Sequence, residues 1–230
     1  MREGIAIILP ALDEEQAIAG TLQGLSGRGL AQILVVDNGS TDRTAAAARD
    51  AGAQVVSEPR RGYGGACLAG IAALEPQIHT VVFMDADGSD DPADLERLLA
   101  PLERGEADMV LGSRVLGERE RGALTPQQRF GNWLATALLR WLYGARYTDL
   151  GPLRAIRRDA LEALQMRDTD YGWTVEMQIK AARHGLRVVE IPVAYRRRRE
   201  GKSKISGTLR GTLAAGWKIL WTIARYARER

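Results

Sequence analysis

The sequence predicts an α/β fold, in which a Rossmann-like, mostly parallel sheet is flanked by helices and followed by a C-terminal amphipathic helix. Over the first 115 residues, short apolar runs alternate with helical segments, and polar side chains follow the runs. Continuous apolar runs are typical of parallel strands that helices cover on both faces. The chain has 230 residues, 45% of them hydrophobic and 27% charged, which is an ordinary globular balance with enough length for a substantial core.

Five apolar runs are predicted to be strands, at residues 5–9, 33–36, 54–56, 80–84 and 109–111. Helices are expected between them, at residues 13–25, 44–51, 66–74 and 92–102. The acidic residues 13–15 would interact favourably with the positive end of the dipole of the first helix, and Pro92 suits the first turn of the fourth helix. In sheets of this kind, ligands bind at the carboxyl ends of the strands.

Polar residues follow the predicted strands where this topology places a site. Pro10, Asp37, Asp85, Asp87 and Arg114 each come after a strand end and would line one crevice, although about 100 positions separate the first from the last. Each one alone also has a plain structural explanation, such as a turn or helix cap at Asp37. Their coincidence at one edge of the sheet favours a functional site.

Asp85 and Asp87 form the strongest local motif. These carboxylates follow a buried strand at positions i and i+2 and would repel each other unless a cation neutralised them. Mg²⁺ or Mn²⁺ is expected there, sharing its coordination with phosphate oxygens. Asp90 and Asp91 are predicted to be helix caps, one of which could reach the metal. The glycine-rich segment 61–65 precedes a helix and would let the backbone approach an anion, an ordinary flexible loop being the alternative.

The net charge of +3 is unevenly distributed. Residues 196–230 contain 11 Lys or Arg and two acids, a balance of +9, while the rest of the chain carries −6. Such a tail suits nucleic acid, an anionic membrane surface or a phosphorylated substrate, or is simply a solvated face. One cysteine and two histidines exclude a disulfide framework and a Cys-based zinc cluster. No apolar run reaches 18 residues, and no signal peptide is recognisable, so a cytoplasmic location is expected.

Two apolar stripes recur at helical spacing. The first would hold an acceptor or form part of its apolar approach; it comprises Phe130, Trp133, Leu134, Ala137, Leu138, Trp141 and Leu142. The second lies in the basic tail, with Lys218, Arg225, Arg228 and Arg230 beside it; it comprises Ile205, Leu209, Leu213, Trp217, Leu220, Trp221 and Ala224. Trp with Arg and Lys on one helix suits a membrane interface, to which residues 196–199 would add charge. A core helix or a dimer helix gives the same stripe.

Four motifs, at residues 8–15, 35–42, 61–66 and 84–88, occur in an order and at spacings that resemble glycosyltransferase family 2. Within that family the chain is similar to the branch of dolichyl-phosphate mannose synthase and related polyprenyl-phosphate glycosyltransferases, over roughly residues 4–204. The resemblance implies a GT-A fold, a UDP- or GDP-linked sugar donor and a divalent metal. It divides the chain into a nucleotide-sugar half at 1–115, an acceptor half at 116–204 and a C-terminal helix at 205–230.

The resemblance also implies roles for individual residues. The donor would be bound by Pro10, Leu12 and Glu14 near the nucleoside, Asp37 at the base, Gly62 and Gly65, the Asp85-Ala86-Asp87 segment, Arg114, and Lys202 and Lys204 over the diphosphate. The metal would be held by Asp85 and Asp87; Ser89 stands where many relatives have a third ligand, a glutamine. Residues 148–154 depart from the Ser-Gly-Phe-Arg pattern of the synthases.

The predicted reaction moves a hexose, with inversion, to a polyprenyl phosphate at the inner membrane face. Arg114, the lysines and the metal would stabilise the leaving diphosphate. If the acceptor is instead a soluble or envelope hydroxyl, Glu176 or Asp149 is the candidate base. A sugar nucleotidyltransferase would need a glycine-rich basic signature at residues 11–15, and a nucleic-acid-binding module would not explain the acidic strand ends.

Overall fold

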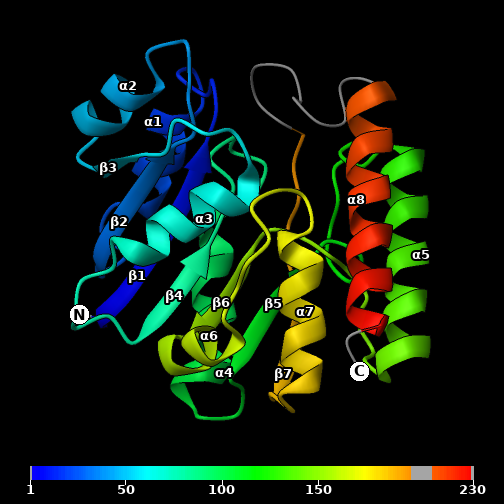
Figure 1. The fold of residues 1–230 in the computed structure, drawn as a ribbon. Helices are drawn as coiled ribbons and strands as arrows, with labels where there is room; N and C mark the ends of the chain where they lie inside the picture. The colour runs from blue at the N-terminus through cyan, green and yellow to red at the C-terminus, as the bar shows by residue number, and fades with distance from the viewer. Residues whose placement is uncertain (1, 198–208, 229–230) are drawn as a thin grey trace.

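Seven strands form one sheet in the order β3-β2-β1-β4-β6-β5-β7 (Figure 1). The structure is a computed structural model that describes residues 2–197 and 209–228. Neighbouring strands are parallel except at β6, which runs antiparallel to both β4 and β5. The strands are β1 (Arg2–Ala11), β2 (Leu30–Asp37), β3 (Gln54–Ser57), β4 (Thr80–Phe83), β5 (Met109–Ser113), β6 (Arg154–Arg157) and β7 (Val188–Pro192). The predicted mostly parallel sheet is therefore confirmed, and β6 and β7 are additions to it.

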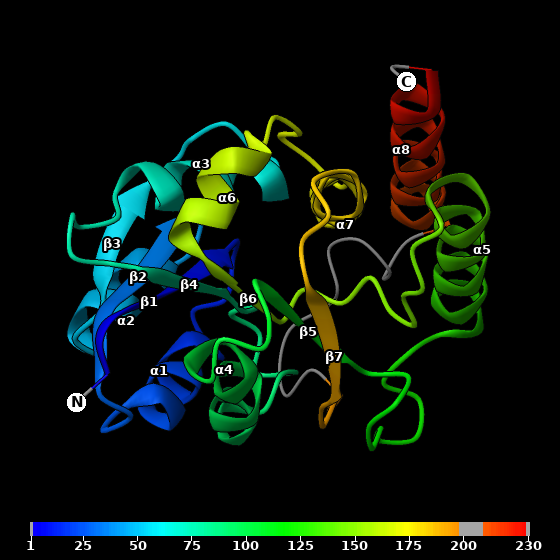
Figure 2. The same ribbon diagram turned by 90° about the horizontal axis from the view of Figure 1, so that it is seen from below.

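Helices cover both faces of the sheet (Figure 2). One core contains apolar side chains of α1 (Ile18–Leu25), α2 (Thr44–Asp50) and α4 (Leu95–Glu103). The opposite core contains those of α3 (Tyr63–Ala72), α6 (Arg158–Leu164) and α7 (Trp173–Arg183). A third cluster joins α7 to the outer helices α5 (Pro126–Tyr143) and α8 (Leu209–Arg228). The alternation of side chains along β1 fills the first two cores, because Ile7 and Leu9 face one side and Ala6 and Ile8 the other.

The expected start of the first helix is wrong, because α1 begins at Ile18 rather than at residue 13. The acidic residues instead join two loops. The Asp13 carboxylate accepts a hydrogen bond from the Thr41 backbone N–H (2.7 Å), and that of Glu15 accepts one from Arg43 N–H (3.0 Å). These long-range bonds hold the loop after β1 against the loop after β2, and thereby shape the edge of the sheet where the polar residues gather.

Two other predicted helices also differ in their limits. The segment expected at 66–74 begins earlier, because α3 starts at Tyr63. The segment expected at 92–102 is divided into a short 3₁₀ turn, η1 (Pro92–Asp94), and α4. Asp91 caps the turn as predicted, since its carboxylate accepts a hydrogen bond from Ala93 N–H at 3.0 Å. Asp90 is not a cap: its carboxylate accepts from Asp85 N–H at 3.3 Å.

The α5 stripe and the described part of the C-terminal stripe fall on helices, while Ile205 lies outside the described residues. The largest side chains of both stripes are exposed, whereas Leu138 and Leu142 pack against the third cluster. In α5, Phe130, Trp133 and Trp141 are exposed, while Ala135 and Leu139 are buried. In the described part of α8, the exposed face carries Trp217, Leu220 and Trp221; the buried face carries Thr222, Ile223 and Tyr226. The buried face of each helix is therefore not centred on its tryptophans. No helix in residues 2–197 or 209–228 combines the length and apolar character needed to cross a bilayer.

Candidate functional site

A pocket of about 640 Å³ opens at the carboxyl ends of β1, β2 and β4. One wall carries most of the charged side chains and is formed by residues at or after the ends of β1, β2, β3 and β4: Pro10, Ala11, Leu12, Asp13, Glu14, Asn38, Arg61, Gly62, Tyr63, Asp85, Ala86 and Asp87. The facing wall belongs to the second half of the chain and to α8: Leu150, Pro152, Asp170, Tyr171, Thr174, Ala215 and Ile219. The pocket therefore has an acidic end at the sheet and a more apolar end at α8.

The carboxylate of Asp87 is held in place by its neighbour Ser89. Both the backbone N–H (2.9 Å) and the hydroxyl (2.6 Å) of Ser89 donate to the same Asp87 oxygen. Ser89 is itself buried and is not among the residues that line the pocket. Its hydroxyl proton is directed at Asp87, so Ser89 makes an orienting contact with that carboxylate, and its place as a metal ligand stays a prediction.

Asp90 lies buried beneath the two pocket carboxylates. One of its oxygens accepts the Asp85 N–H, and the other has no hydrogen-bond partner. Burial, together with the negative charge of Asp87, raises the pKa of Asp90 to about 7. The negative charge of Asp87 thus disfavours a second charged carboxylate beneath it.

This arrangement fits a divalent cation that shares its coordination with a ligand. Asp85 and Asp87 both face the pocket, and an orphaned carboxylate oxygen of Asp90 lies behind them. Within the described ranges, no cluster of three or more His, Cys, Asp or Glu side chains is arranged to hold an ion unaided. Mg²⁺ and Mn²⁺ are commonly held by one or two carboxylates, with phosphate oxygens and water in the remaining positions.

The glycine-rich segment 62–65 packs against a second backbone segment. A Cβ on Gly64 would lie 2.0 Å from the carbonyl oxygen of Asp168, and one on Gly62 would lie 2.2 Å from that of Thr169. Gly65 N–H donates to the Thr169 carbonyl at 2.9 Å. These glycines therefore permit a close approach of protein backbone to protein backbone, and Gly62 also lines the pocket.

Asn38, which the sequence analysis did not single out, organises the same segment. Its side-chain amide donates to the carbonyls of Glu58 (3.0 Å) and Arg60 (2.8 Å) and accepts the Gly62 N–H (2.8 Å). The neighbouring Asp37 accepts the Ser40 N–H at 3.1 Å, which is the turn contact considered as its structural alternative. Asn38 lines the pocket and Asp37 does not.

Arg114 and Asp149 form a buried ion pair. The Asp149 carboxylate accepts from the Arg114 backbone N–H, Nε and one terminal nitrogen, each at 2.8 Å. The Arg114 guanidinium also lies over the Tyr195 ring, 5.0 Å from its centre. Neither residue lines the pocket. Three donors bind the Asp149 carboxylate, which leaves it poorly placed to act as the predicted base.

Glu176 is likewise a structural carboxylate in this fold. It is buried and pairs with Lys180 at 2.8 Å, accepts the Tyr226 hydroxyl at 2.6 Å, and accepts backbone N–H groups of Arg167 and Asp168. Burial alone would raise its pKa, but hydrogen bonds from Lys180 and Tyr226 hold the pKa of Glu176 below its usual value. The group anchors the segment that leads to Asp170 and Tyr171, and it does not reach the pocket lining.

The structure therefore brings together part of the predicted site. The predicted residues that line the pocket are Pro10, Leu12, Glu14, Gly62, Asp85, Ala86 and Asp87. Those that do not are Asp37, Gly65, Ser89, Arg114, Asp149 and Glu176. Lys202 and Lys204 lie outside the described residues. The sequence analysis missed Tyr171, Thr174, Ala215 and Ile219, because no local motif marks them as pocket residues.

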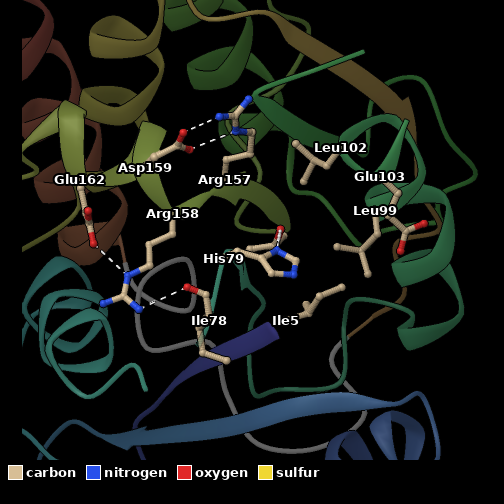
Figure 3. A pocket seen from close by; sticks show the side chains of 11 residues that line it. Ile5, Ile78, His79, Leu99, Leu102, Glu103, Arg157, Arg158, Asp159 and Glu162 are labelled. Carbon is tan, nitrogen blue, oxygen red and sulfur yellow. Dashed lines mark hydrogen bonds and ion pairs between the residues drawn. The ribbon is translucent and has the colours of Figure 1, made fainter. Parts of the chain in front are cut away.

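A second cavity, of about 600 Å³, lies near the amino ends of β1 and β4, and Figure 3 shows the side chains that line it. Its arginines are already paired: Arg157 with Asp159, and Arg158 with Glu162 at 2.8 Å. The ring nitrogen Nδ1 of His79 contacts the Thr80 hydroxyl at 3.1 Å. None of the predicted site residues lines this cavity.

Comparisons with known proteins agree with the geometry of the first pocket. The profile of glycosyl transferase family 2 matches residues 6–165. An uncharacterized glycosyltransferase of Mycobacterium tuberculosis is 40% identical, covering 95% of this chain and 98% of its own. An undecaprenyl-phosphate mannosyltransferase of Micrococcus luteus is 32% identical, covering 94% of this chain and 97% of its own.

Solved structures of glucosyl-3-phosphoglycerate synthase from Mycobacterium tuberculosis are also similar. The complex with Mn²⁺, uridine diphosphate and phosphoglyceric acid superposes with a TM-score of 0.80 at 25% identity, covering 98% of this chain and 79% of the synthase. Both kinds of comparison span nearly the whole of this chain, including the helices beyond the region that the family profile matches.

Proposed function

The chain belongs to glycosyl transferase family 2 and is a glycosyltransferase of GT-A fold, and from this premise we propose that it transfers a hexose from a nucleoside diphosphate sugar to a polyprenyl phosphate. The observation that carries the proposal is the two-ended pocket. Its acidic end suits a metal-bound diphosphate, and its other end offers apolar side chains from residues 150–152 and α8.

The donor is assigned to the acidic end. Pro10, Leu12 and Glu14 would lie against the nucleoside, and Asp37 would support the base side through the turn that it makes with Ser40. Gly62 and Gly65 belong to a segment whose shape is set by Asn38 and by the 168–169 backbone. These contacts order the donor end before any ligand binds, which lowers the entropic cost of binding.

The metal is assigned to Asp85 and Asp87. Mg²⁺ or Mn²⁺, when bound, would stabilise the negative charge that develops on the departing diphosphate. Ser89 keeps the Asp87 carboxylate in one orientation through two hydrogen bonds. Arg114 contributes positive charge near Asp90, while Lys202 and Lys204 would contribute theirs from outside the described residues.

The reaction is a displacement at the anomeric carbon of the sugar. An oxygen of the acceptor phosphate forms the new bond as the bond to the diphosphate breaks, so a single step inverts the configuration. A phosphate acceptor arrives already ionised and needs no strong base. This agrees with the state of Glu176 and Asp149, whose carboxylates are both occupied by ion pairs away from the pocket lining.

The apolar end of the pocket supports a lipid acceptor. Leu150, Pro152, Ala215 and Ile219 would contact the first isoprene unit beside the phosphate. The relative from Micrococcus luteus, an undecaprenyl-phosphate mannosyltransferase, matches over almost its full length. The apolar stripe of α5, expected to hold the acceptor or form its approach, does not line the pocket: Phe130, Trp133 and Trp141 are exposed, and Leu138 and Leu142 pack against the third cluster.

A small phosphorylated acceptor is the second candidate, favoured by the likeness to glucosyl-3-phosphoglycerate synthase. The two candidates share a phosphorylated acceptor and the same donor end. They differ in what the apolar end contacts, so the two acceptors can be compared directly in one assay.

The test measures release of nucleoside diphosphate and formation of glycosylated product. UDP-glucose, UDP-galactose, UDP-N-acetylglucosamine and GDP-mannose are each supplied with Mg²⁺ or Mn²⁺ and either a short-chain polyprenyl phosphate or 3-phosphoglycerate. Asp87→Asn should abolish turnover, whereas Asp91→Asn, a matched change at a turn cap, should retain it. Product with the lipid phosphate supports the proposal, product with phosphoglycerate alone replaces it by the second candidate, and no metal-dependent turnover with any donor refutes both.

A further inference from the structure

α5 and α8 lie side by side at one edge of the molecule (Figures 1 and 2). Their outer surface carries four of the five tryptophans of the chain: Trp133, Trp141, Trp217 and Trp221 are 62, 80, 73 and 44% exposed. The fifth, Trp173, is buried. A cluster of exposed aromatic side chains is unusual on a soluble surface and marks a contact with an apolar partner.

The charge of the two helices indicates what kind of partner this is. By sequence, α5 and α8 together contain six Lys or Arg and no Asp or Glu. Arg225 and Lys218 lie over the Trp221 ring, 5.5 and 5.2 Å from its centre, and Lys218 also pairs with Asp168 at 3.1 Å. Cations beside tryptophans suit the headgroup region of an anionic bilayer. A second copy of the chain would instead set these cations against cations.

The described part of α8 has two faces with different neighbours. At about 100° per residue, Trp217, Leu220 and Trp221 lie on the side opposite Ala215 and Ile219. Ala215 and Ile219 line the pocket, and the tryptophans are exposed. The pocket and the aromatic surface are thus separated by one helix, which is about 10 Å thick.

We propose that the outer surface of α5 and α8 lies on an anionic lipid bilayer, with α8 separating the bilayer from the apolar end of the pocket. The expected membrane contact through residues 196–230 is thereby extended to α5, which contributes Phe130, Trp133 and Trp141. The packing of the two helices fixes their relative position, because the Tyr143 hydroxyl donates to the Ile223 carbonyl at 3.0 Å and both helices share one core. This inference concerns binding and does not depend on the proposed reaction.

The test uses the full chain and vesicles of phosphatidylcholine with or without phosphatidylglycerol. Sedimentation measures binding, and the blue shift of tryptophan fluorescence reports burial of the exposed indoles. We expect binding to the anionic vesicles, weakened by salt. Trp133→Ser/Trp141→Ser should weaken it more than about tenfold. Arg129→Gln/Arg140→Gln should weaken it about 25-fold, at roughly fivefold per charge.

A matched control removes the same number of charges elsewhere. Arg104→Gln/Arg157→Gln changes exposed arginines outside the two helices and should bind vesicles like the wild type. Equal losses in the control and the α5 arginine variant would show non-specific charge attraction and overturn the proposal. So would failure of the wild type to bind anionic vesicles, or a dimer that the tryptophan variant dissociates.

The outcome is separable from that of the proposed function. Transfer to a short-chain polyprenyl phosphate in solution needs no vesicle, so the α5 variants should keep that activity while losing vesicle binding. Vesicle binding without any glycosyl transfer would support the membrane-binding surface and refute only the proposed reaction. Transfer in solution without vesicle binding would support the proposed reaction and refute the membrane-binding surface.

Discussion

Replacing Glu176 by glutamine tests whether this carboxylate is structural or catalytic. In the structure it is 1% exposed and pairs with Lys180, itself only 10% exposed. Glutamine keeps the shape but removes the charge, which leaves the Lys180 ammonium buried without its counter-ion. Breaking a buried ion pair from one side costs about 3–5 kcal/mol. For a chain of this length, about 2–4 °C per kcal/mol converts this into a fall in melting temperature of about 6–20 °C.

A matched pair on the surface provides the control. Glu162 and Arg158 have the same i,i+4 spacing and the same 2.8 Å separation, but Glu162 is 61% exposed. An exposed pair contributes about 0–1 kcal/mol, so Glu162→Gln should lower the melting temperature by less than about 4 °C. Tyr226→Phe, which removes one hydrogen bond to the buried carboxylate, should cost about 1.5–3 kcal/mol.

The pH dependence of the effect follows from the direction of the pKa shift. Because the hydrogen bonds hold the pKa of Glu176 below its usual 4.5, the carboxylate binds its proton less readily in the folded than in the unfolded chain. Its contribution to stability is therefore complete above the unfolded pKa and is lost as the pH falls through the folded pKa. The difference in melting temperature between wild type and Glu176→Gln should close in acid.

Thermal unfolding followed by circular dichroism measures these effects, with turnover measured on the same preparations below the melting temperature of the variant. The structural interpretation requires a large loss of stability with turnover retained while the chain is folded. An unchanged melting temperature with turnover abolished would refute it, and would return Glu176 to the role of base.

Two further predictions concern the pocket. Gly64→Ala should lower the free energy of unfolding by about 1–3 kcal/mol and weaken donor binding, because the new Cβ would lie 2.0 Å from a carbonyl oxygen. The control is Gly20→Ala, whose Cβ would meet nothing within 4 Å and which should raise the free energy of unfolding by up to about 1 kcal/mol. Thermal unfolding measures both. Equal changes in stability for the two variants would contradict the close packing of Gly64 against the 168–169 backbone. Ser89→Ala should weaken Mn²⁺ binding in the presence of UDP about 10–100-fold by titration calorimetry, since Asp87 loses a hydrogen bond; unchanged affinity would show that Ser89 does not orient it.

The parallel part of the sheet was predictable because each strand is a continuous apolar run. β6 and β7 were not predicted, since neither has a distinctive local pattern. β6 has only four residues, and two of them, Arg154 and Arg157, are charged. Its position is set by antiparallel pairing with β4 and β5, which lie tens of residues away along the chain. Long-range pairing of this kind leaves no local periodicity.

The pocket carboxylates were predictable for the same reason as the strands: Asp85 and Asp87 follow β4 directly in sequence. The partners of the other charged residues were not predictable, because those partners lie on elements that are distant in the sequence. Asp149 meets Arg114 across 35 positions, and Glu176 meets Tyr226 across 50. A carboxylate in the sequence is a candidate base until the fold shows that its oxygens are occupied, and only tertiary packing shows this.

The two outer helices show why periodicity alone did not give their orientation. A helix with large apolar residues on one face is normally assumed to bury that face. α5 and α8 bury Ala135, Leu139, Ile223 and Tyr226 in one shared core and leave tryptophans outside. The indoles therefore remain available to a partner. The same two helices can therefore support the pocket from one side and contact lipid from the other, which would couple the position of the enzyme on the membrane to the position of its acceptor.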